Sequence, residues 1–166
     1  MSYIGIIYEM IGSGFLKSIM FICTGNICRS PMAHAYMQKK LYDLNKENEY
    51  IISSCGTNAT QGQCATDNAI ESIKKYDVDL TNHRATCIEN SNILECDLIL
   101  VLTHNHKIQV LQIYPKLSDK VFTLKEYVND EEKYKDIDDP YGLDSNVYNA
   151  TAKDIVENID KLLQIL

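Results

Sequence analysis

Short apolar runs alternate with more polar stretches along the chain, and four of these runs predict β-strands. They are "IMFI" at residues 19–22, "YIISSC" at 50–55, "CDLILVLT" at 96–103 and "DKVFTL" at 119–124. Continuous apolar runs are typical of parallel strands buried on both faces of a sheet. The run at 96–103 is the strongest, which favours a central position for its strand.

Between these runs, apolar residues recur at intervals of three and four, as in amphipathic helices. The first predicted helix follows Ser30 and has Pro31 in its first turn, where no helical hydrogen bond is lost. Its apolar positions are Met32, Ala33, Tyr36, Met37, Leu41 and Leu44. A second helix, from about Thr66, has a predicted buried face of Ala69, Ile70, Ile73 and Tyr76.

Two further helices are predicted in the second half of the chain. Thr103 is a suitable N-cap for the first of them, and Pro115 ends it. Its predicted buried positions are Ile108, Leu111 and Gln112. The last helix starts at about Asp144, and its apolar stripe comprises Tyr148, Ala152, Ile155, Val156, Ile159, Leu162, Leu163 and Leu166.

The resulting order, β-α-β-α-β-α-β-loop-α, predicts an α/β fold with three layers and a central four-stranded parallel sheet. One domain is expected over residues 19–166, preceded by a loose extension at 1–18. Glu9 interrupts that extension, which is too short for a membrane span. Ligands of open parallel sheets bind beyond the C-terminal ends of the strands. The turn after the first strand ends at this edge.

Composition excludes some classes of function. The 166 residues have a formal net charge of -7, which argues against a general nucleic-acid binder but permits one local phosphate site. The six cysteines are scattered, and no clear signal peptide precedes them. We therefore expect a cytoplasmic protein in a reducing compartment, with no membrane association, and we expect a monomer.

The turn "CTGNICRSP" after the first strand carries the strongest candidate chemistry. A zinc site is disfavoured because Cys23 and Cys28 have four residues between them and no second pair matches. A Cys-x-x-Cys redox motif is absent from the turn. An anion site explains more, because the amides of residues 24–30 can curl around one phosphate at a helix N-terminus. Arg29 would then bind two phosphate oxygens.

Other residues of the turn fit the same interpretation. Gly25 would permit close approach and unusual backbone angles, and Asn26 tolerates left-handed geometry. The positive surroundings would stabilise a Cys23 thiolate, to which Ser30 can donate a hydrogen bond. Thr24 would contribute a backbone amide. The turn therefore predicts a nucleophile directed at phosphorus. A buried structural Cys23 would leave Arg29 unexplained.

A leaving group needs a proton, and the "DIDDPYG" stretch is a candidate source. Crowding of Asp136, Asp138 and Asp139 would favour keeping a proton on one of them. Pro140 stiffens the chain behind Asp139. Taken alone, this segment also fits an ordinary solvated acidic loop.

These motifs resemble the low-molecular-weight protein tyrosine phosphatases, over residues 17–166. The resemblance implies Cys23 as nucleophile, Arg29 as phosphate clamp and Asp139 as general acid and then base. It also implies a histidine, His83, that supports the loop through Asn26. No cofactor or metal is implied, and the expected partners are phosphorylated proteins.

The resemblance implies roles at the rim of the pocket as well. Cys28 matches a cysteine that forms a reversible disulfide with the nucleophile and protects it from irreversible oxidation. Tyr141 is expected to form an aromatic wall. The bacterial branch of the family includes arginine phosphatases, which tend to carry Thr at the position of Ile27. Ile27 is an apolar wall suited to an aromatic ring, which favours phosphotyrosine over phosphoarginine.

Three other classes of protein share part of this pattern. A thioredoxin-coupled arsenate reductase needs two further cysteines, for which Cys87 and Cys96 are candidates, but Thr103 stands at the end of the strongest strand. A phosphoryl-carrier domain of a sugar transport system has no need of Arg29 or an acid. A catalytically inactive phosphopeptide-binding module would be expected to lack Cys23 or Asp139.

Overall fold

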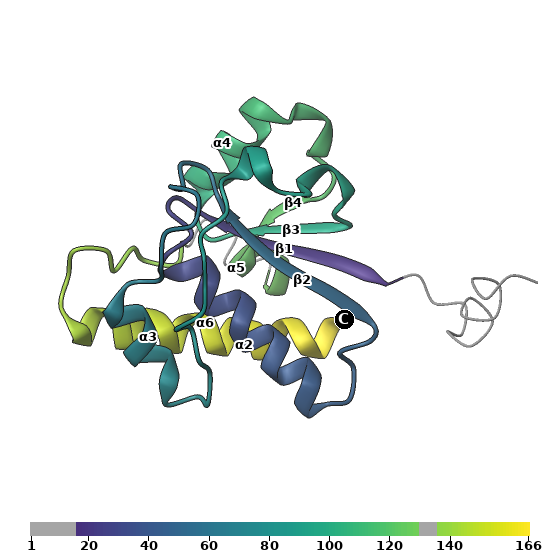
Figure 1. Cartoon of the computed structure of the whole chain (residues 1–166). Helices are drawn as coiled ribbons and strands as arrows, with labels where there is room; N and C mark the ends of the chain where they lie inside the picture. Colours follow the sequence, from purple (N-terminus) through teal and green to yellow (C-terminus); the bar gives the residue numbers. More distant parts are fainter. Residues whose placement is uncertain (1–15, 130–135) are drawn as a thin grey trace, which may run out of the picture.

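The computed structural model describes residues 16–129 and 136–166, which form a four-stranded sheet covered by helices on both faces (Figure 1). The sheet order is β2-β1-β3-β4, and all neighbouring pairs are parallel. The strands are β1 (Lys17–Cys23), β2 (Tyr50–Gly56), β3 (Leu98–Val101) and β4 (Val121–Thr123). The predicted three-layer α/β fold is confirmed.

The helices divide between the two faces of the sheet (Figure 1). One face is covered by α2 (Arg29–Asp43), α3 (Asp67–Lys74), α5 (Leu124–Val128) and α6 (Ser145–Ile165). The other face is covered by α4 (His104–Ile113) and the short 3-10 turns η1 (Ile88–Asn90), η2 (Ile93–Glu95) and η3 (Pro115–Leu117). The connections therefore place helices on both sides, as parallel crossovers require.

Alternation along β1 explains why its sequence is apolar throughout. Ile19 and Phe21 belong to the core beneath α2 and α6, whereas Met20 and Ile22 belong to the core on the α4 side. Successive side chains of a strand point to opposite faces, so a strand buried on both needs apolar residues at every position.

Three of the predicted helices begin at residues that cap them. Thr66 accepts a hydrogen bond from the amide of Ala69, and Asp144 accepts from those of Asn146 and Val147. Thr103 accepts from the amide of His106 at 3.1 Å. Each bond satisfies an amide that lacks a helical partner, and the predicted starts of these helices are confirmed.

The predicted buried face of α4 is wrong. Ile108 is 44% exposed, Leu111 is half-buried and Gln112 is exposed, whereas His106 and Val110 are buried. The helix is short, and apolar residues occur on several of its sides. Its orientation is set by the narrow stripe that meets β4 and η3, which the sequence pattern does not specify.

The predicted fourth strand is also too long. Its hydrogen-bonded part ends at Thr123, which accepts from the amide of Glu126 and begins α5. This helix was not predicted.

The predicted loose extension lies largely in residues 1–15, which are outside the described residues, so the division at 18 stays a prediction. Strand β1 begins at Lys17, which pairs with Tyr50. Within residues 16–129 and 136–166, none of the helices has the length and hydropathy needed to cross a membrane.

Candidate active site

The turn between β1 and α2 is held in a left-handed bend at Asn26, whose φ is 52°. Its side-chain amide donates to the hydroxyls of Ser30 at 2.8 Å and Ser54 at 2.9 Å. Its side-chain oxygen accepts from the amide of Thr86 at 2.9 Å. These bonds stabilise a backbone conformation that few residues other than glycine adopt, as predicted for Asn26.

Gly25 does not have the positive φ that the sequence analysis allowed for it. Gly62 and Gly142 are the described glycines with positive φ, so Gly25 does not supply the expected unusual backbone angle. A Cβ on Gly25 would lie 3.3 Å from Cγ1 of Ile27, so its small size lets Ile27 fold over it.

Gly56, at the end of β2, was missed by the sequence analysis. A Cβ there would overlap the carbonyl oxygen of Thr24 and lie 2.9 Å from the amide nitrogen of Asn26. Glycine therefore lets the turn pack directly against the adjacent strand. The only sequence signal was a glycine at the end of a predicted strand.

Cys23 is buried at the end of β1, and its sulfur lies 3.0 Å from the hydroxyl of Ser30. Because Asn26 donates to the oxygen of Ser30, the hydrogen of that hydroxyl can go to the sulfur of Cys23 at 3.0 Å or to the carbonyl of Cys55 at 3.4 Å, and the sulfur is the nearer acceptor. The structure thus provides the predicted donor to a Cys23 thiolate, and a side chain that fixes the donor.

Arg29 connects the turn to the acidic loop. Its buried guanidinium forms an ion pair with Asp139, with 2.8 Å between Nη2 and Oδ2, and Nη1 donates to the carbonyl of Ile137 at 3.1 Å. The amide of Tyr141 donates to the other carboxylate oxygen of Asp139 at 3.2 Å. A buried guanidinium needs such partners, and it keeps further N–H donors for an anion.

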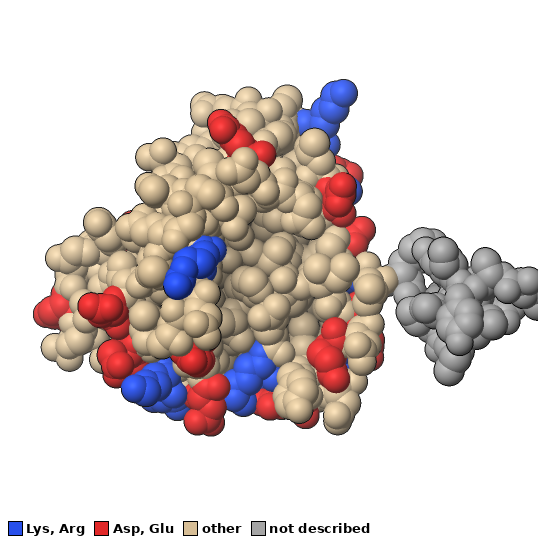
Figure 2. Space-filling view, viewed as in Figure 1, with Lys and Arg blue, Asp and Glu red and all other residues tan. Residues whose placement is uncertain are grey.

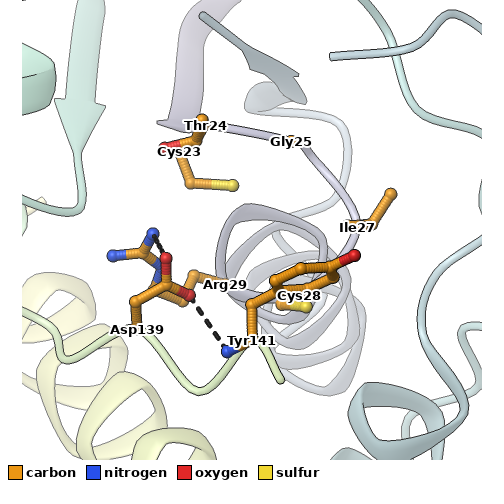
Figure 3. Close-up of a pocket in the computed structure, with 8 residues that line it drawn as sticks. All are labelled: Cys23, Thr24, Gly25, Ile27, Cys28, Arg29, Asp139 and Tyr141. Atoms are coloured by element: carbon orange, nitrogen blue, oxygen red, sulfur yellow. Dashed lines mark hydrogen bonds and ion pairs between the residues drawn. The ribbon is translucent and has the colours of Figure 1, made fainter. Parts of the chain in front are cut away.

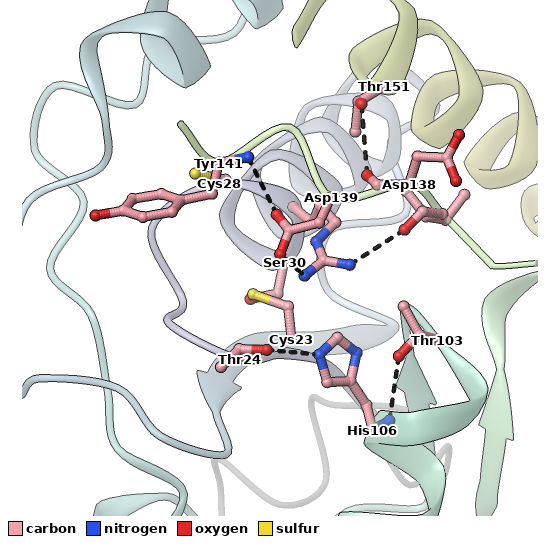
Figure 4. Close-up of polar contacts among 12 residues, drawn as sticks. Cys23, Thr24, Cys28, Ser30, Thr103, His106, Asp138, Asp139, Tyr141 and Thr151 are labelled. Atoms are coloured by element: carbon pink, nitrogen blue, oxygen red, sulfur yellow. Dashed lines mark hydrogen bonds and ion pairs between the residues drawn. The ribbon is translucent and has the colours of Figure 1, made fainter. Parts of the chain in front are cut away.

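Of the three crowded aspartates, Asp139 alone reaches the pocket. The carboxylate of Asp136 accepts from the amide of His104 at the start of α4, at 2.7 Å. Asp138 is exposed and has its carbonyl 3.5 Å from the hydroxyl of Thr151 (Figure 4). Each carboxylate has its own surroundings, so mutual crowding does not describe this loop.

A pocket of about 180 Å³ lies between the turn and the acidic loop (Figure 3). It is lined by Cys23, Thr24, Gly25, Ile27, Cys28, Arg29, Asp139 and Tyr141. Ile27 is 8% exposed and Tyr141 is 63% exposed, so the first is a fixed apolar wall and the second stands at the open side. The predicted residues outside this lining are Asn26, Ser30 and His83.

His83 contacts the turn where the resemblance implied. Its Nε2 lies 2.7 Å from the carbonyl oxygen of Asn26, so the bond is to the backbone and not to the side chain. Burial, and the nearby charge of Arg84, lower the pKa of His83. The neutral ring then donates its Nε2 hydrogen to this carbonyl.

Cys28 is buried at the start of α2, and its sulfur lies 3.3 Å from the hydroxyl of Tyr148 and 3.4 Å from that of Thr66. Burial raises the pKa of the Cys28 thiol. Burial also raises the pKa of Cys55 to about 12 and that of Cys96 to about 11.

Among the residues that the structure describes, no group of three metal-ligating side chains is found.

His106 is a second residue that the sequence analysis missed. It is 3% exposed, and its Nε2 lies 2.8 Å from the hydroxyl oxygen of Thr24 (Figure 4). Burial and the neighbouring Arg29 lower its pKa to about 4. The segment "THNHK" follows a central strand, but nothing in it distinguishes His106 from His104.

A buried cysteine at the base of a turn, with an arginine and a carboxylate lining the same pocket, is the arrangement that a cysteine-dependent phosphatase requires. The family model described as low molecular weight phosphotyrosine protein phosphatase matches residues 18–166, and the chain belongs to this family. The match favours a phosphatase over the arsenate reductase and the phosphoryl carrier.

Relatives within the family carry two kinds of name. The chain is 34% identical over 151 residues to a protein-arginine-phosphatase of Bacillus subtilis, covering 89% of this chain and 95% of the relative. It is 37% identical over 146 residues to the low molecular weight protein-tyrosine-phosphatase PtpB of Staphylococcus epidermidis, covering 87% and 95%.

Solved structures show the same division. A low molecular weight protein tyrosine phosphatase from T. tengcongensis superposes with a TM-score of 0.83 at 36% identity, covering 90% of this chain and 99% of that one. The YwlE arginine phosphatase from Geobacillus stearothermophilus superposes with a TM-score of 0.81 at 32% identity, covering 89% and 91%.

Proposed function

We propose that this protein hydrolyses phosphotyrosine in phosphorylated proteins through a phosphocysteine formed on Cys23. The observation that supports this most is the pocket that Cys23, Arg29 and Asp139 share beneath the side chains of Ile27 and Tyr141. A phosphoryl group would enter between the turn and Arg29, and the aromatic ring of the substrate would lie along Ile27.

In the first step, the Cys23 thiolate attacks phosphorus and the bond from phosphorus to the tyrosine oxygen breaks. Asp139 acts in its protonated form, after the phosphoryl group has replaced it on Arg29, and gives its proton to the departing oxygen, which would otherwise leave as a poor phenolate leaving group. The amides of residues 24–30 and the guanidinium of Arg29 stabilise the equatorial oxygens of the transition state. Ser30 stabilises the thiolate through the contact at 3.0 Å.

In the second step, Asp139 accepts a proton from a water molecule, and the oxygen of that water attacks the phosphocysteine. The phosphorus–sulfur bond breaks, which returns the Cys23 thiolate and releases phosphate. Asp139 is suited to both steps because it is half exposed and faces Cys23 across the pocket (Figure 3). Asn26 and His83 act by holding the turn. When a peroxide oxidises Cys23 to a sulfenic acid, the Cys28 thiol would attack its sulfur, release water and form a reversible disulfide, which shields Cys23 from irreversible oxidation.

Phosphoarginine is the second candidate substrate, and the names of two relatives support it. The wall of the pocket opposes it, because Ile27 is an apolar side chain with no hydroxyl to orient attack on a phosphoramidate. The test compares kcat/KM on matched phosphotyrosine and phosphoarginine peptides, for the wild type and for Ile27→Thr.

We expect the wild type to favour the phosphotyrosine peptide and Ile27→Thr to shift the ratio of the two kcat/KM values toward phosphoarginine by about tenfold or more. Ile27→Val is the matched control, because it keeps an apolar wall and should leave the ratio near that of the wild type. A wild type that favours phosphoarginine would reverse the proposed substrate.

We further propose a monomeric, cytoplasmic enzyme whose partners are its protein substrates. The six cysteines are unpaired, which is consistent with a reducing compartment. On the face shown in Figure 2, the described Lys and Arg side chains lie among Asp and Glu side chains and form no continuous basic patch. This distribution and the net charge of -7 argue against a nucleic-acid partner.

A further inference from the structure

The contact between Thr24 and His106 has no part in the mechanism above. Thr24 lines the pocket next to Cys23, and His106 is in the first turn of α4, on the opposite side of the sheet from α2. Their side chains meet at 2.8 Å beside the nucleophile (Figure 4). Thr24 itself is exposed, so water could satisfy its hydroxyl without a buried partner.

The surroundings of His106 decide the direction of this hydrogen bond. The ring is neutral at pH 7 and carries one proton, on Nδ1 or on Nε2. Nδ1 is buried and has no hydrogen-bond partner among the described residues. A proton there would leave a buried N–H with no acceptor, which costs more than a buried lone pair with no donor, whereas a proton on Nε2 has the hydroxyl oxygen of Thr24 as its acceptor. The proton therefore belongs on Nε2, which donates to Thr24.

This direction determines what the hydroxyl of Thr24 can do. Its oxygen accepts from His106, so its own hydrogen is free to donate elsewhere. In residues 16–129 and 136–166, its side chain has no other hydrogen-bond partner. The acceptor that the pocket is built to hold is an anion.

We propose that His106 is a positioning residue, which orients the hydroxyl of Thr24 to donate a hydrogen bond to an oxygen of the phosphoryl group in the pocket. The inference rests on the proposed function, because it needs a phosphoryl group at that place. It adds one side-chain donor to the backbone amides and Arg29. It also explains why a buried histidine with an unpartnered nitrogen stands beneath an exposed threonine.

The test measures kcat and KM for p-nitrophenyl phosphate and, separately, the Kd of inorganic phosphate by calorimetry. Thr24→Val removes the hydroxyl and keeps the shape, and should lower kcat/KM and weaken phosphate binding by about tenfold each, the value of one hydrogen bond. Thr24→Ser keeps the hydroxyl and should stay within about twofold of the wild type.

Variants of His106 separate positioning from folding. His106→Leu should lose as much as Thr24→Val, and the double variant should lose no more than either single one. His106→Gln offers an amide N–H to Thr24 and should recover most of the loss. Gln109→Ala is the matched control, since Gln109 lies on the same helix and accepts from Thr57 at 2.9 Å, away from the pocket. It should leave both constants unchanged.

The inference is overturned if the Thr24→Val variant binds phosphate as tightly as the wild type. It is also overturned if the losses of kcat/KM and phosphate affinity in the two single variants multiply in the double variant. This substitution is at an exposed site, so it decides the matter even if His106→Leu fails to fold. An inactive wild type whose phosphate affinity still depends on the Thr24 hydroxyl would contradict the proposed function and sustain this inference.

Discussion

Arg29 and Asp139 form an ion pair across the pocket, with 2.8 Å between Nη2 and Oδ2. The pair connects the turn after β1 to the loop before α6, so one contact places both the proposed phosphate clamp and the proposed acid. It also means that a substrate anion approaches a guanidinium that already has one carboxylate partner. The remaining N–H donors of Arg29 are those available to phosphate.

Cys23→Ser should abolish turnover of p-nitrophenyl phosphate, because a serine hydroxyl is a much weaker nucleophile than a thiolate. Inorganic phosphate should still bind, since the amides of the turn and Arg29 remain. Steady-state kinetics and calorimetry measure the two effects. Cys64→Ser, at an exposed cysteine outside the pocket, is the control and should keep full activity. Turnover by Cys23→Ser would refute the assignment of the nucleophile.

Asp139→Asn should slow turnover by about 10²- to 10⁴-fold for poor leaving groups and much less for good ones, because an amide supplies no proton. The asparagine oxygen can still accept from Arg29, which limits structural damage. A series of aryl phosphates of graded leaving-group pKa gives the dependence. Asp138→Asn changes the neighbouring exposed carboxylate and should have little effect. If it produced the same dependence, the acid would be Asp138.

Gly56→Ala should destabilise the fold by about 2 kcal/mol or more and reduce activity, because the added methyl group overlaps the carbonyl of Thr24. The turn would have to move to accommodate it. Urea unfolding and kcat/KM measure the two effects. Gly62→Ala has open space around it but a φ of +83°, so it should cost only about 1 kcal/mol and keep activity. Equal effects of the two substitutions would argue against close packing at Gly56.

Stability should fall as the pH falls from about 6.5 to 4. Burial lowers the pKa of His34 to about 4, and His83 adds to this effect once it is itself protonated at low pH. Burial and the charge of Arg29 lower the pKa of His106 to about 4 as well. Histidine in the unfolded chain titrates near 6.5, so in this window the unfolded state binds more protons than the folded state. This protonation lowers the free energy of the unfolded state relative to the folded state, and the free energy of unfolding falls. The buried ring of His106 contributes up to about 3 kcal/mol and the half-buried ring of His34 contributes less, and both contributions are fully present above pH 6.5.

Urea unfolding at a series of pH values measures this dependence. His34→Gln removes one of the two groups and should reduce the slope between pH 6.5 and 4. The side-chain amide of glutamine can replace the hydrogen bond between Nδ1 of His34 and the hydroxyl of Ser54, which spans 3.2 Å. An unfolding free energy that is constant from pH 7 to 4.5 would be inconsistent with buried neutral histidines.

Much of the site follows from residues that are neighbours in the sequence. The spacing of Cys23 and Arg29, with Asn26 between them, predicts an anion-binding turn, and the structure has Asn26 in the left-handed region. The sequence pattern alone did not distinguish which aspartate faces the pocket, because three aspartates lie within four positions. Their roles depend on which partner each one meets, and the partners of Asp136 and Asp139 are on different elements.

The sequence by itself determined the positions of the four strands, the caps of three helices and the turn after β1, because these depend on backbone geometry over a few residues. Only the tertiary structure decided which face of α4 is buried, which brings His106 to Thr24. It also decided that Gly56 must lack a side chain and that Asp139 is the carboxylate in the pocket. These relationships join residues far apart in the chain, and they arise from how the helices pack on the sheet.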